Sequence, residues 1–326
     1  PKPQNPGREY LSLRLKYSID MAEAGNARPY PNGRFDLAAP QGGIILKDQD
    51  NMVSNVAKDI LKTVGKNLVK GNVGNIMKIR TPAYVHSPMS YLDCIKFEFC
   101  MLEQFLLKAR ELDVLEKPLE RIKWITAAQI GAIHVGVKSV GIRSPLNPIL
   151  GETKCLQTEM GSMLYMEQTS HHPPITHYHM QGPADLPFEV YGYVEFRVEI
   201  KGAFSSALFS CPGKMTLKMP DGSKFDITTK QIECTGLLSS EKGFNVVGQV
   251  NVSDNDNGVY AEVKFDAMKD KRTGYWTSFI KGSDKVNKDT GKLDNRSDLI
   301  TISVTDDADC QISAGEGSYL EQVVFD

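Results

Sequence analysis

The sequence predicts a protein that is mainly β with α, in which a helical section precedes a long antiparallel β-region. Up to about residue 135, apolar residues recur at the three- and four-residue spacing of helices. From about residue 153 the spacing changes to two, and turn residues separate the apolar segments. Because the helices come first, we expect them to pack on, or to plug, a large meandering sheet or barrel.

The composition is that of a soluble globular chain. Its 326 residues are 41% hydrophobic and 24% charged, which is enough apolar material for a sizeable core. The net charge of −2 creates no overall field for nucleic acid, so any attraction to an anionic surface must be local. The sequence has no apolar run of membrane-spanning length, and its first residues, PKPQNPGREY, lack a signal-peptide core.

The cysteines are scattered along the chain without a C-x-x-C pair. This spacing favours reduced thiols in a cytoplasmic protein over a disulfide framework or a zinc site. The six are Cys94, Cys100, Cys155, Cys211, Cys234 and Cys310.

Residues 1–50 are rich in proline, glycine and asparagine, which predicts an N-terminal tether or loop. Within this region we expect only LSLRLKYSIDMAEA, residues 11–24, to form a short helix.

Residues 51–71 form the clearest amphipathic pattern, with an apolar face opposite a basic one. The lysines lie two residues from the apolar set, which is about 200° around a helix axis at ~100° per residue. The glycines of KGNVGN end the helix. Taken alone, the pattern indicates a surface helix with a solvated basic side. The apolar residues are Val53, Val56, Ile60, Val64 and Leu68, and the basic ones are Lys58, Lys62, Lys66 and Lys70.

Two further helices are predicted at residues 91–112 and 115–135, the second beginning loosely because of Pro118. In the β-region, residues 188–201 alternate apolar and polar side chains, so that the set from Phe188 to Ile200 shares one face. Hairpin turns are expected at residues 220–222 and 255–258. The last residues, GSYLEQVVFD, resemble an unfinished strand, so we expect a missing C-terminal piece.

The stretch MEQTSHHPPITHYHM, residues 166–180, contains four of the six histidines. A metal-dependent barrel enzyme would use His171, His177 and His179, but His171 and His172 point to opposite sides of a strand. A general base next to Ser170 is a second possibility, although no G-x-S-x-G elbow occurs. Ordinary strand histidines are the favoured interpretation of His177 and His179. Anion binding suits the other two, because the following prolines stiffen the backbone and imidazolium rings donate to phosphate oxygens.

Three motifs settle the choice by resemblance. EQTSHHPP, residues 167–174, resembles the fingerprint E-Q-x-S-H-H-P-P of the oxysterol-binding protein family, matching all seven fixed positions. PLNPILGET, residues 145–153, resembles the family's lid-contacting and headgroup-binding loop, and PAYVHSPMS, residues 82–90, its proline-rich entry to the core. The similarity covers roughly residues 50–326 and indicates the lipid-binding domain of a short family member.

The resemblance implies a large incomplete antiparallel β-barrel that encloses a hydrophobic tunnel, with residues 51–71 as the N-terminal lid helix, residues 82–135 as the helical section and residues 145–326 as the barrel. It also implies that His171 and His172 grip the phosphate of a phosphoinositide headgroup, while Leu146 and Asn147 contact the inositol ring and glycerol. The family usually has a basic residue where Ser144 stands, so Arg143 or Lys154 is expected to replace it. The family's C-terminal helices, which complete the headgroup site, have no counterpart here.

The function implied by the resemblance is lipid binding and transport rather than catalysis, without a metal or other cofactor. Members exchange a sterol, or in some cases a phospholipid, for phosphatidylinositol 4-phosphate between membranes. We therefore expect a monomeric cytoplasmic carrier that associates peripherally with anionic membrane surfaces and binds no nucleic acid. A metal-dependent enzyme using the histidine cluster, and a lipid sensor without transfer activity, are the alternatives.

Overall fold

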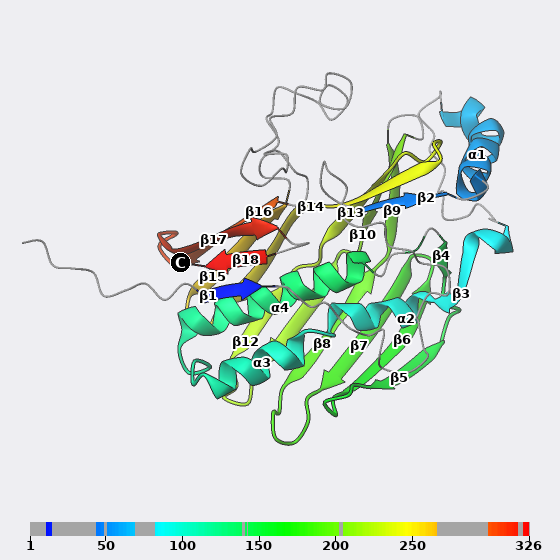
Figure 1. Ribbon diagram of the computed structural model, residues 1–326. Helices are drawn as coiled ribbons and strands as arrows, with labels where there is room; N and C mark the ends of the chain where they lie inside the picture. Colours follow the sequence, from blue (N-terminus) through cyan, green and yellow to red (C-terminus); the bar gives the residue numbers. More distant parts are fainter. Residues whose placement is uncertain are drawn as a thin grey trace, which may run out of the picture.

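The computed structural model describes residues 11–14, 44–48, 51–68, 82–138, 141, 143–201, 205–265, 299–318 and 322–325. Strands of one large antiparallel sheet dominate the described chain, and helices lie across one of its faces (Figure 1). The predicted class, mainly β with α and with an unclosed barrel, is confirmed.

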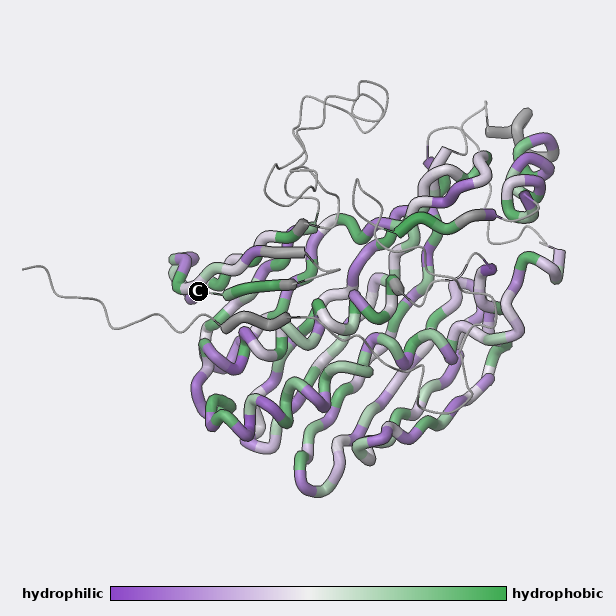
Figure 2. The backbone as a smooth tube through the Cα atoms, viewed as in Figure 1, coloured by the Kyte–Doolittle hydropathy of each residue, from purple (hydrophilic) through white to green (hydrophobic). Residues whose placement is uncertain are grey.

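The main path of the sheet runs from an edge at β1 to an edge at β5, so the described strands do not close into a ring. Hydrophilic and hydrophobic residues alternate along many of the strands (Figure 2), as expected where one face is covered. In sheet order the strands are β1 (Leu11–Arg14), β18 (Gln322–Phe325), β17 (Gln311–Ser318), β16 (Leu299–Asp306), β15 (Val259–Phe265), β14 (Glu241–Asp254), β12 (Lys224–Ile227), β11 (Gly213–Lys218), β8 (Glu189–Glu195), β7 (Pro174–Gln181), β6 (Met163–His171) and β5 (Thr153–Gln157).

The long strand β14 joins this path to a side branch. Its second half pairs with β15 and β12, whereas its first half pairs with β13 and β2. Gly248, with φ of +81°, lies at the change of partner, where glycine tolerates the left-handed backbone. The branch consists of β2 (Ile44–Lys47), β13 (Gln231–Thr235), β10 (Ser206–Ser210) and β9 (Arg197–Lys201).

The helices and a small parallel strand pair complete the fold. Helix α4 packs against β14 and β15 as well as against α3. Helix α1 lies apart from the others, beside the end of the side branch (Figure 1). The elements are α1 (Met52–Leu68), η3 (Ala83–Val85), β3 (His86–Ser90), α2 (Tyr91–Ile95), η4 (Lys96–Glu98), α3 (Leu102–Glu111), α4 (Pro118–Lys138) and β4 (Ser144–Leu146).

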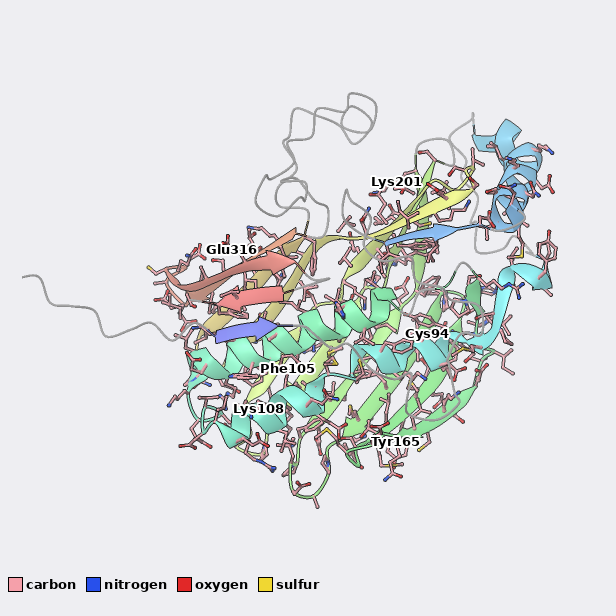
Figure 3. The ribbon with its side chains drawn as sticks, in the orientation of Figure 1. Cys94, Phe105, Lys108, Tyr165, Lys201 and Glu316 are labelled. Carbon is pink, nitrogen blue, oxygen red and sulfur yellow. The ribbon has the colours of Figure 1, made fainter. Side chains whose placement is uncertain are left out.

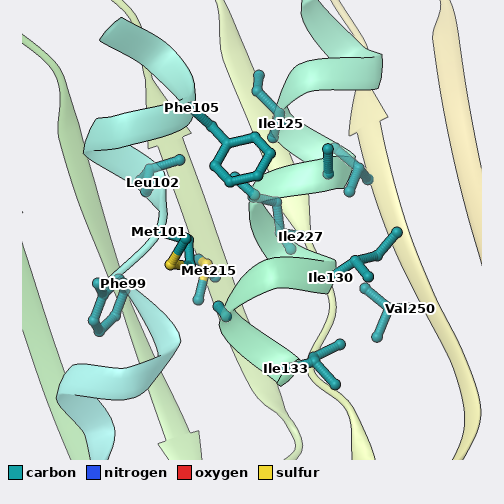
Figure 4. Close-up of a cluster of buried hydrophobic side chains, with 14 of the residues drawn as sticks. Phe99, Met101, Leu102, Phe105, Ile125, Ile130, Ile133, Met215, Ile227 and Val250 are labelled. Atoms are coloured by element: carbon teal, nitrogen blue, oxygen red, sulfur yellow. The ribbon is translucent and has the colours of Figure 1, made fainter. Parts of the chain in front are cut away.

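The hydrophobic core fills the space between the α3–α4 layer and the sheet (Figure 4). Ile125 and Ile130 of α4 are almost completely buried opposite the inward residues of β12 and β14, Ile227 and Val250. This burial removes one face of both layers from water and is the main stabilising contribution to the domain.

Most predicted elements are confirmed. Helix α4 begins at Pro118, a residue suited to a first helical position because it lacks an N–H. Both hairpins turn where expected, at Gly222 and Gly258, which have positive φ. The expected inward set of residues 188–201 is buried or lines the cavity described below.

Two expectations are corrected. The segment Leu11–Arg14 is a strand paired with β18, not the start of a helix, and Ile44–Lys47 is also a strand, so the expected tether contributes to the sheet. The helix expected at 91–112 is broken into α2, η4 and α3. The break places Phe99 edge-on against Tyr178, with ring centroids 5.0 Å apart, so tertiary packing overrides the local helical pattern.

Candidate functional site

A cavity of about 420 Å³ lies between α1, α2 and the side branch of the sheet. Its wall is built by alternate residues of β9, β10 and β13, because successive side chains of a strand point to opposite faces. The pairing register arranges these residues in layers across the three strands. The first layer is Ile200, Ala207 and Cys234, and the second is Val198, Phe209 and Ile232.

Helix α1 closes one end of the cavity with the apolar face predicted from the sequence. Val53, Val56 and Ile60 line the cavity, as does Ala57. Burial of these side chains holds the helix against the strands.

The basic face of α1 points away from the cavity. Lys58 and Lys62 are exposed, and Lys62 pairs with Asp59 at 3.2 Å. That pair is about three quarters exposed on both sides, so it contributes little to stability. The side chains of Val64, Lys66 and Leu68, and the whole of Lys70, lie outside the described residues.

The start of α1 is anchored by a buried polar cluster, which we call the lid anchor: Asp48, Ser54 and Lys242. The backbone N–H groups of Val53 and Ser54 donate to the Asp48 carboxylate over 3.1 and 2.8 Å. These are two of the first-turn donors that no helix can satisfy internally. The Lys242 ammonium, from β14, donates to Ser54 Oγ over 2.8 Å and to Asp48 over 3.3 Å.

The lid anchor is almost completely excluded from solvent, since the side chains of Lys242 and Asp48 are 1% and 0% exposed. Burial alone would raise the pKa of Asp48, but the hydrogen bonds from Ser54 and Val53 and the charge of Lys242 outweigh it. The pKa of Asp48 therefore lies below its usual value, and the carboxylate is charged at neutral pH.

The two fingerprint histidines form a corner where β6 turns into β7. Their rings lie 4.6 Å apart between centroids, and His172 is exposed while His171 is half-buried. The Nδ1–H of His171 donates to the carbonyl oxygen of Pro148 over 3.0 Å, because a carbonyl can only accept. The peptide bond between His172 and Pro173 is cis. The hydrogen bond fixes the His171 ring and leaves Nε2 as the nitrogen that can face a ligand.

The loop between β4 and β5 packs against this corner. Gly151, with φ of +78°, donates its N–H to the Gln168 carbonyl, and the Glu152 carboxylate accepts from the N–H of Ile149 over 3.1 Å. These two residues therefore shape the loop. Leu146, the last residue of β4, and Asn147, the first residue of the loop, were expected to touch a headgroup. Both are exposed, Leu146 at 45%.

The two candidate basic residues have different surroundings. Arg143 is exposed and lines the cavity. Lys154, in contrast, forms an ion pair with Asp93 of α2, and it lies opposite Met166 in the β5–β6 register. His171 is five residues further along β6, about 16 Å at ~3.3 Å per residue. Arg143 thus lies at the cavity, whereas the structure does not bring Lys154 to the histidine corner.

The other two histidines of the cluster, His177 and His179, lie on the outward face of β7. His177 shares a 2.7 Å hydrogen bond with Thr169 and lies 5.5 Å from the Tyr193 ring. The structure finds no group of three His, Cys, Asp or Glu side chains, within its described part, that could hold a metal ion. All six cysteines are free thiols.

Sequence reasoning missed the charged residues that face inward. Lys242 precedes Phe244 and Val246 at two-residue spacing, and Lys230 likewise precedes Ile232 and Cys234. Both lysines therefore share the parity of buried apolar residues on their strands. That parity was readable from the sequence, but their acidic partners, Asp48 and Glu98, are far away along the chain.

The sequence was compared with protein-family models and with known proteins. A family model described as oxysterol-binding protein matches residues 65–305. Human oxysterol-binding protein-related protein 8 is 27% identical over 250 residues, which cover 75% of this chain and 26% of that protein. Oxysterol-binding protein 9 of Dictyostelium discoideum is 22% identical over 278 residues, which cover 83% of this chain and 61% of the relative. The chain thus spans about a quarter of the length of the human relative.

Solved structures show the same fold. The Osh3 ORD of Saccharomyces cerevisiae in complex with PI(4)P has a TM-score of 0.59 at 21% identity, covering 80% of this chain and 61% of that chain. The Osh1 ORD domain in complex with ergosterol also has a TM-score of 0.59, at 17% identity, covering 83% of this chain and 64% of that chain. None of the described helices combines the length and the apolar character that a membrane span needs.

Proposed function

The chain belongs to the oxysterol-binding protein family, and from this premise we propose that it is a lipid carrier and not an enzyme. The observation that carries the proposal is the apolar cavity of about 420 Å³ beneath the apolar face of α1. Such a cavity replaces water around hydrocarbon, which stabilises the bound lipid by about 0.8 kcal/mol per buried CH₂. Val64 and Leu68 are proposed to continue the apolar face of this lid.

The proposed second cargo is phosphatidylinositol 4-phosphate, with its headgroup at the histidine corner. His171 and His172 present two rings 4.6 Å apart, and His171 is hydrogen-bonded to Pro148, which lies three residues after the cavity-lining Pro145. Imidazolium N–H groups make charge-assisted hydrogen bonds to phosphate oxygens, which are stronger than neutral ones. Arg143 adds a positive charge there, and the exposed Leu146 and Asn147 contact the rest of the headgroup. The match to a domain solved in complex with PI(4)P supports this assignment.

The two faces of α1 support a proposal for transfer between membranes. We propose that Lys58, Lys62, Lys66 and Lys70 approach an anionic membrane surface, where each nearby basic residue contributes about 1 kcal/mol. The protein then works as a monomer on the cytoplasmic side, exchanging a sterol or phospholipid for the phosphoinositide.

Two alternatives lead to different measurements. A metal-dependent enzyme would need His171 and His177 at one ion, but His177 lies on the outward face of β7. Stoichiometric zinc or iron in purified protein would support the enzyme. A lipid sensor would bind the same lipids as a carrier without moving them between liposomes.

The test is extraction of each lipid from liposomes by a variant in which His171→Ala and His172→Ala are combined. Extraction of phosphatidylinositol 4-phosphate should fall by more than about tenfold, since each lost charge-assisted bond contributes roughly 1.5–3 kcal/mol. Uptake of the other cargo should largely survive, because it needs no phosphate contact. The matched control is His177→Ala with His179→Ala, which removes two histidines of the same cluster from the outward face. Equal loss of both cargoes in a folded histidine-corner variant would refute this division of roles.

A further inference from the structure

The outer face of the sheet carries a second depression, which lipid binding in the cavity does not explain. It is an open groove of about 700 Å³ across β5, β6, β7, β8 and β11, and we call it the outer groove. Figure 3 shows Tyr165, one of its residues, well away from α1 and from Lys201 of the side branch. Its outward-facing rings have the strand parity opposite to the buried residues Met166 and Tyr178. The rings belong to Tyr165, His177, His179, Tyr191 and Tyr193.

The strand register arranges these rings in two rows across the strands. In the first row, Tyr165 of β6 lies opposite His179 of β7, which lies opposite Tyr191 of β8. In the second row, His177 lies opposite Tyr193, with ring centroids 5.5 Å apart. All three tyrosines are exposed. Tyrosine is enriched where proteins bind partners, so a group of exposed tyrosines on one face indicates a binding surface.

The outer groove offers hydrogen-bond donors as well as rings. Within the described part of the chain, the hydroxyls of Tyr165, Tyr191 and Tyr193 have no hydrogen-bond partner. A ligand that suits them has an apolar body and free acceptors. A proline-rich segment in the polyproline II conformation has this character, because its carbonyl groups are not bonded internally and proline has no N–H.

The spacing of the first row matches that conformation. Tyr165 and Tyr191 are two strands apart, which is about 9.6 Å at ~4.8 Å per strand. Polyproline II advances about 9.3 Å in each three-residue turn, at ~3.1 Å per residue. A proline-rich segment that lies across the strands therefore places every third residue on a tyrosine ring.

The charges of the outer groove restrict the ligand further. Its two lysines, Lys154 and Lys214, form ion pairs with Asp93 and Asp226, so the groove has no free positive charge for nucleic acid. Glu167, on the same strand as the first tyrosine, is exposed and has no ion-pair partner among the described residues. Its carboxylate is complementary to a basic side chain of the ligand.

We propose that the outer groove binds a proline-rich segment of a partner protein. Prolines three residues apart lie on Tyr165 and Tyr191, and a lysine or arginine of the segment lies next to Glu167. Aromatic-lined grooves recognise this conformation because it is preformed and loses little entropy on binding. The outer groove and the cavity lie on opposite faces of the sheet, so this inference is independent of the carrier function.

The first test measures binding of short labelled peptides to the unaltered protein by fluorescence anisotropy. The probes are Pro-Pro-Ala repeats with an arginine at the amino end or at the carboxyl end, and matched Gly-Gly-Ala repeats. We expect one of the arginine-containing proline peptides to bind at least about tenfold more tightly than its glycine counterpart, because glycine loses more conformational freedom. Equal binding of proline and glycine peptides, or binding of neither, overturns the inference.

The second test changes the groove. Combining Tyr165→Ala with Tyr191→Ala should weaken peptide binding at least about tenfold, since buried aromatic anchors carry most of the binding energy at an interface. The corresponding Phe variants keep the rings and remove the donors, so they should lose only about threefold. Glu167→Gln should remove the advantage of the arginine. The control, Tyr84→Ala, removes an exposed tyrosine outside the groove and should change nothing.

Three outcomes separate this site from other roles of the same face. A folded double Ala variant that binds the peptide as tightly as the unaltered protein refutes the site. If the proline peptides do not bind and the Ala variant loses binding to phosphatidylserine vesicles, the face is a membrane surface and the inference is wrong. Lipid extraction by the Ala variant should be unchanged. A loss of extraction equal to the loss of peptide binding would show that the groove belongs to the lipid site instead.

Discussion

The lid anchor and the histidine corner are both built from polar side chains, and Lys242 of the anchor lines the cavity. At the anchor, Asp48 and Lys242 are excluded from water and satisfy each other and the first turn of α1. At the corner, His171 uses one ring nitrogen to hold Pro148, and His172 is exposed. The comparison teaches that burial and hydrogen-bond satisfaction, not residue type, separate groups that hold the structure from groups that can bind a ligand.

The largest effect is expected at the anchor. Lys242→Met leaves the Asp48 carboxylate buried without its cation, which should lower the free energy of unfolding by about 3–5 kcal/mol. Urea unfolding measures the loss, and hydrogen exchange of residues 52–62 shows whether α1 detaches first. Lys62→Met serves as the control on the same helix, because its ion pair is exposed and should matter little. Similar unfolding midpoints for both variants would show that the buried pair is not an anchor.

A smaller effect, confined to binding, is expected beside the corner. Leu146→Asp places a carboxylate at the exposed last residue of β4, next to Pro145, a cavity-lining residue. Repulsion of phosphate and the cost of burying an unpaired charge under a lipid should reduce extraction of both cargoes by roughly tenfold. The empty protein should melt normally, since the carboxylate stays hydrated. A variant that still extracts both lipids would show that Leu146 does not lie at the cavity mouth.

The anchor should also make the free energy of unfolding depend on acid pH. Because the folded-state pKa of Asp48 lies below its unfolded value of about 3.9, its contribution is present above that pH. The contribution is lost as the pH falls through the lower, folded-state pKa. Thermal melts between pH 6 and pH 2 should therefore decline less steeply for Asp48→Asn than for the unaltered protein. Parallel declines would exclude Asp48 as a source of the acid sensitivity.

The smallest effect on equilibrium binding is expected from the exposed face of α1. Changing Lys58, Lys62 and Lys66 together to Glu should slow transfer from anionic liposomes and flatten its salt dependence, because this attraction is screened within a Debye length of about 8 Å. Cargo affinity should stay within about twofold, since the described lysines Lys58 and Lys62 do not line the cavity. If transfer from strongly anionic liposomes is unchanged, the basic face is only a solvated surface and does not attract the membrane.

Local sequence patterns were sufficient to predict which residues face inward wherever a single helix or strand buries one of its faces. The spacing of Val53, Val56 and Ile60 predicted an apolar face of α1, and the alternation over residues 188–201 predicted one shared face of a strand. In the structure both faces line the cavity. The structure joins two of the sequence motifs through the 3.0 Å hydrogen bond from His171 to Pro148. The break in the helix at Phe99 could not be predicted, because it depends on packing against Tyr178, a residue of a distant strand.

By itself, the sequence determined the order of helices and strands, the amphipathic character of α1 and the neighbouring positions of His171 and His172, because periodicity and turn chemistry act between near neighbours. Only the tertiary structure decided that Lys242 meets Asp48, that Lys230 meets Glu98, and that Lys154 turns to Asp93 rather than to the corner. Each of these pairs joins residues at least 61 positions apart. Whether these residues meet depends on the strand register and on which face each strand buries. A lysine carries the same charge whether it is buried or exposed. Whether its charge holds the fold, forms an ion pair at the cavity or faces water is set by the partner and the burial that the folded chain supplies.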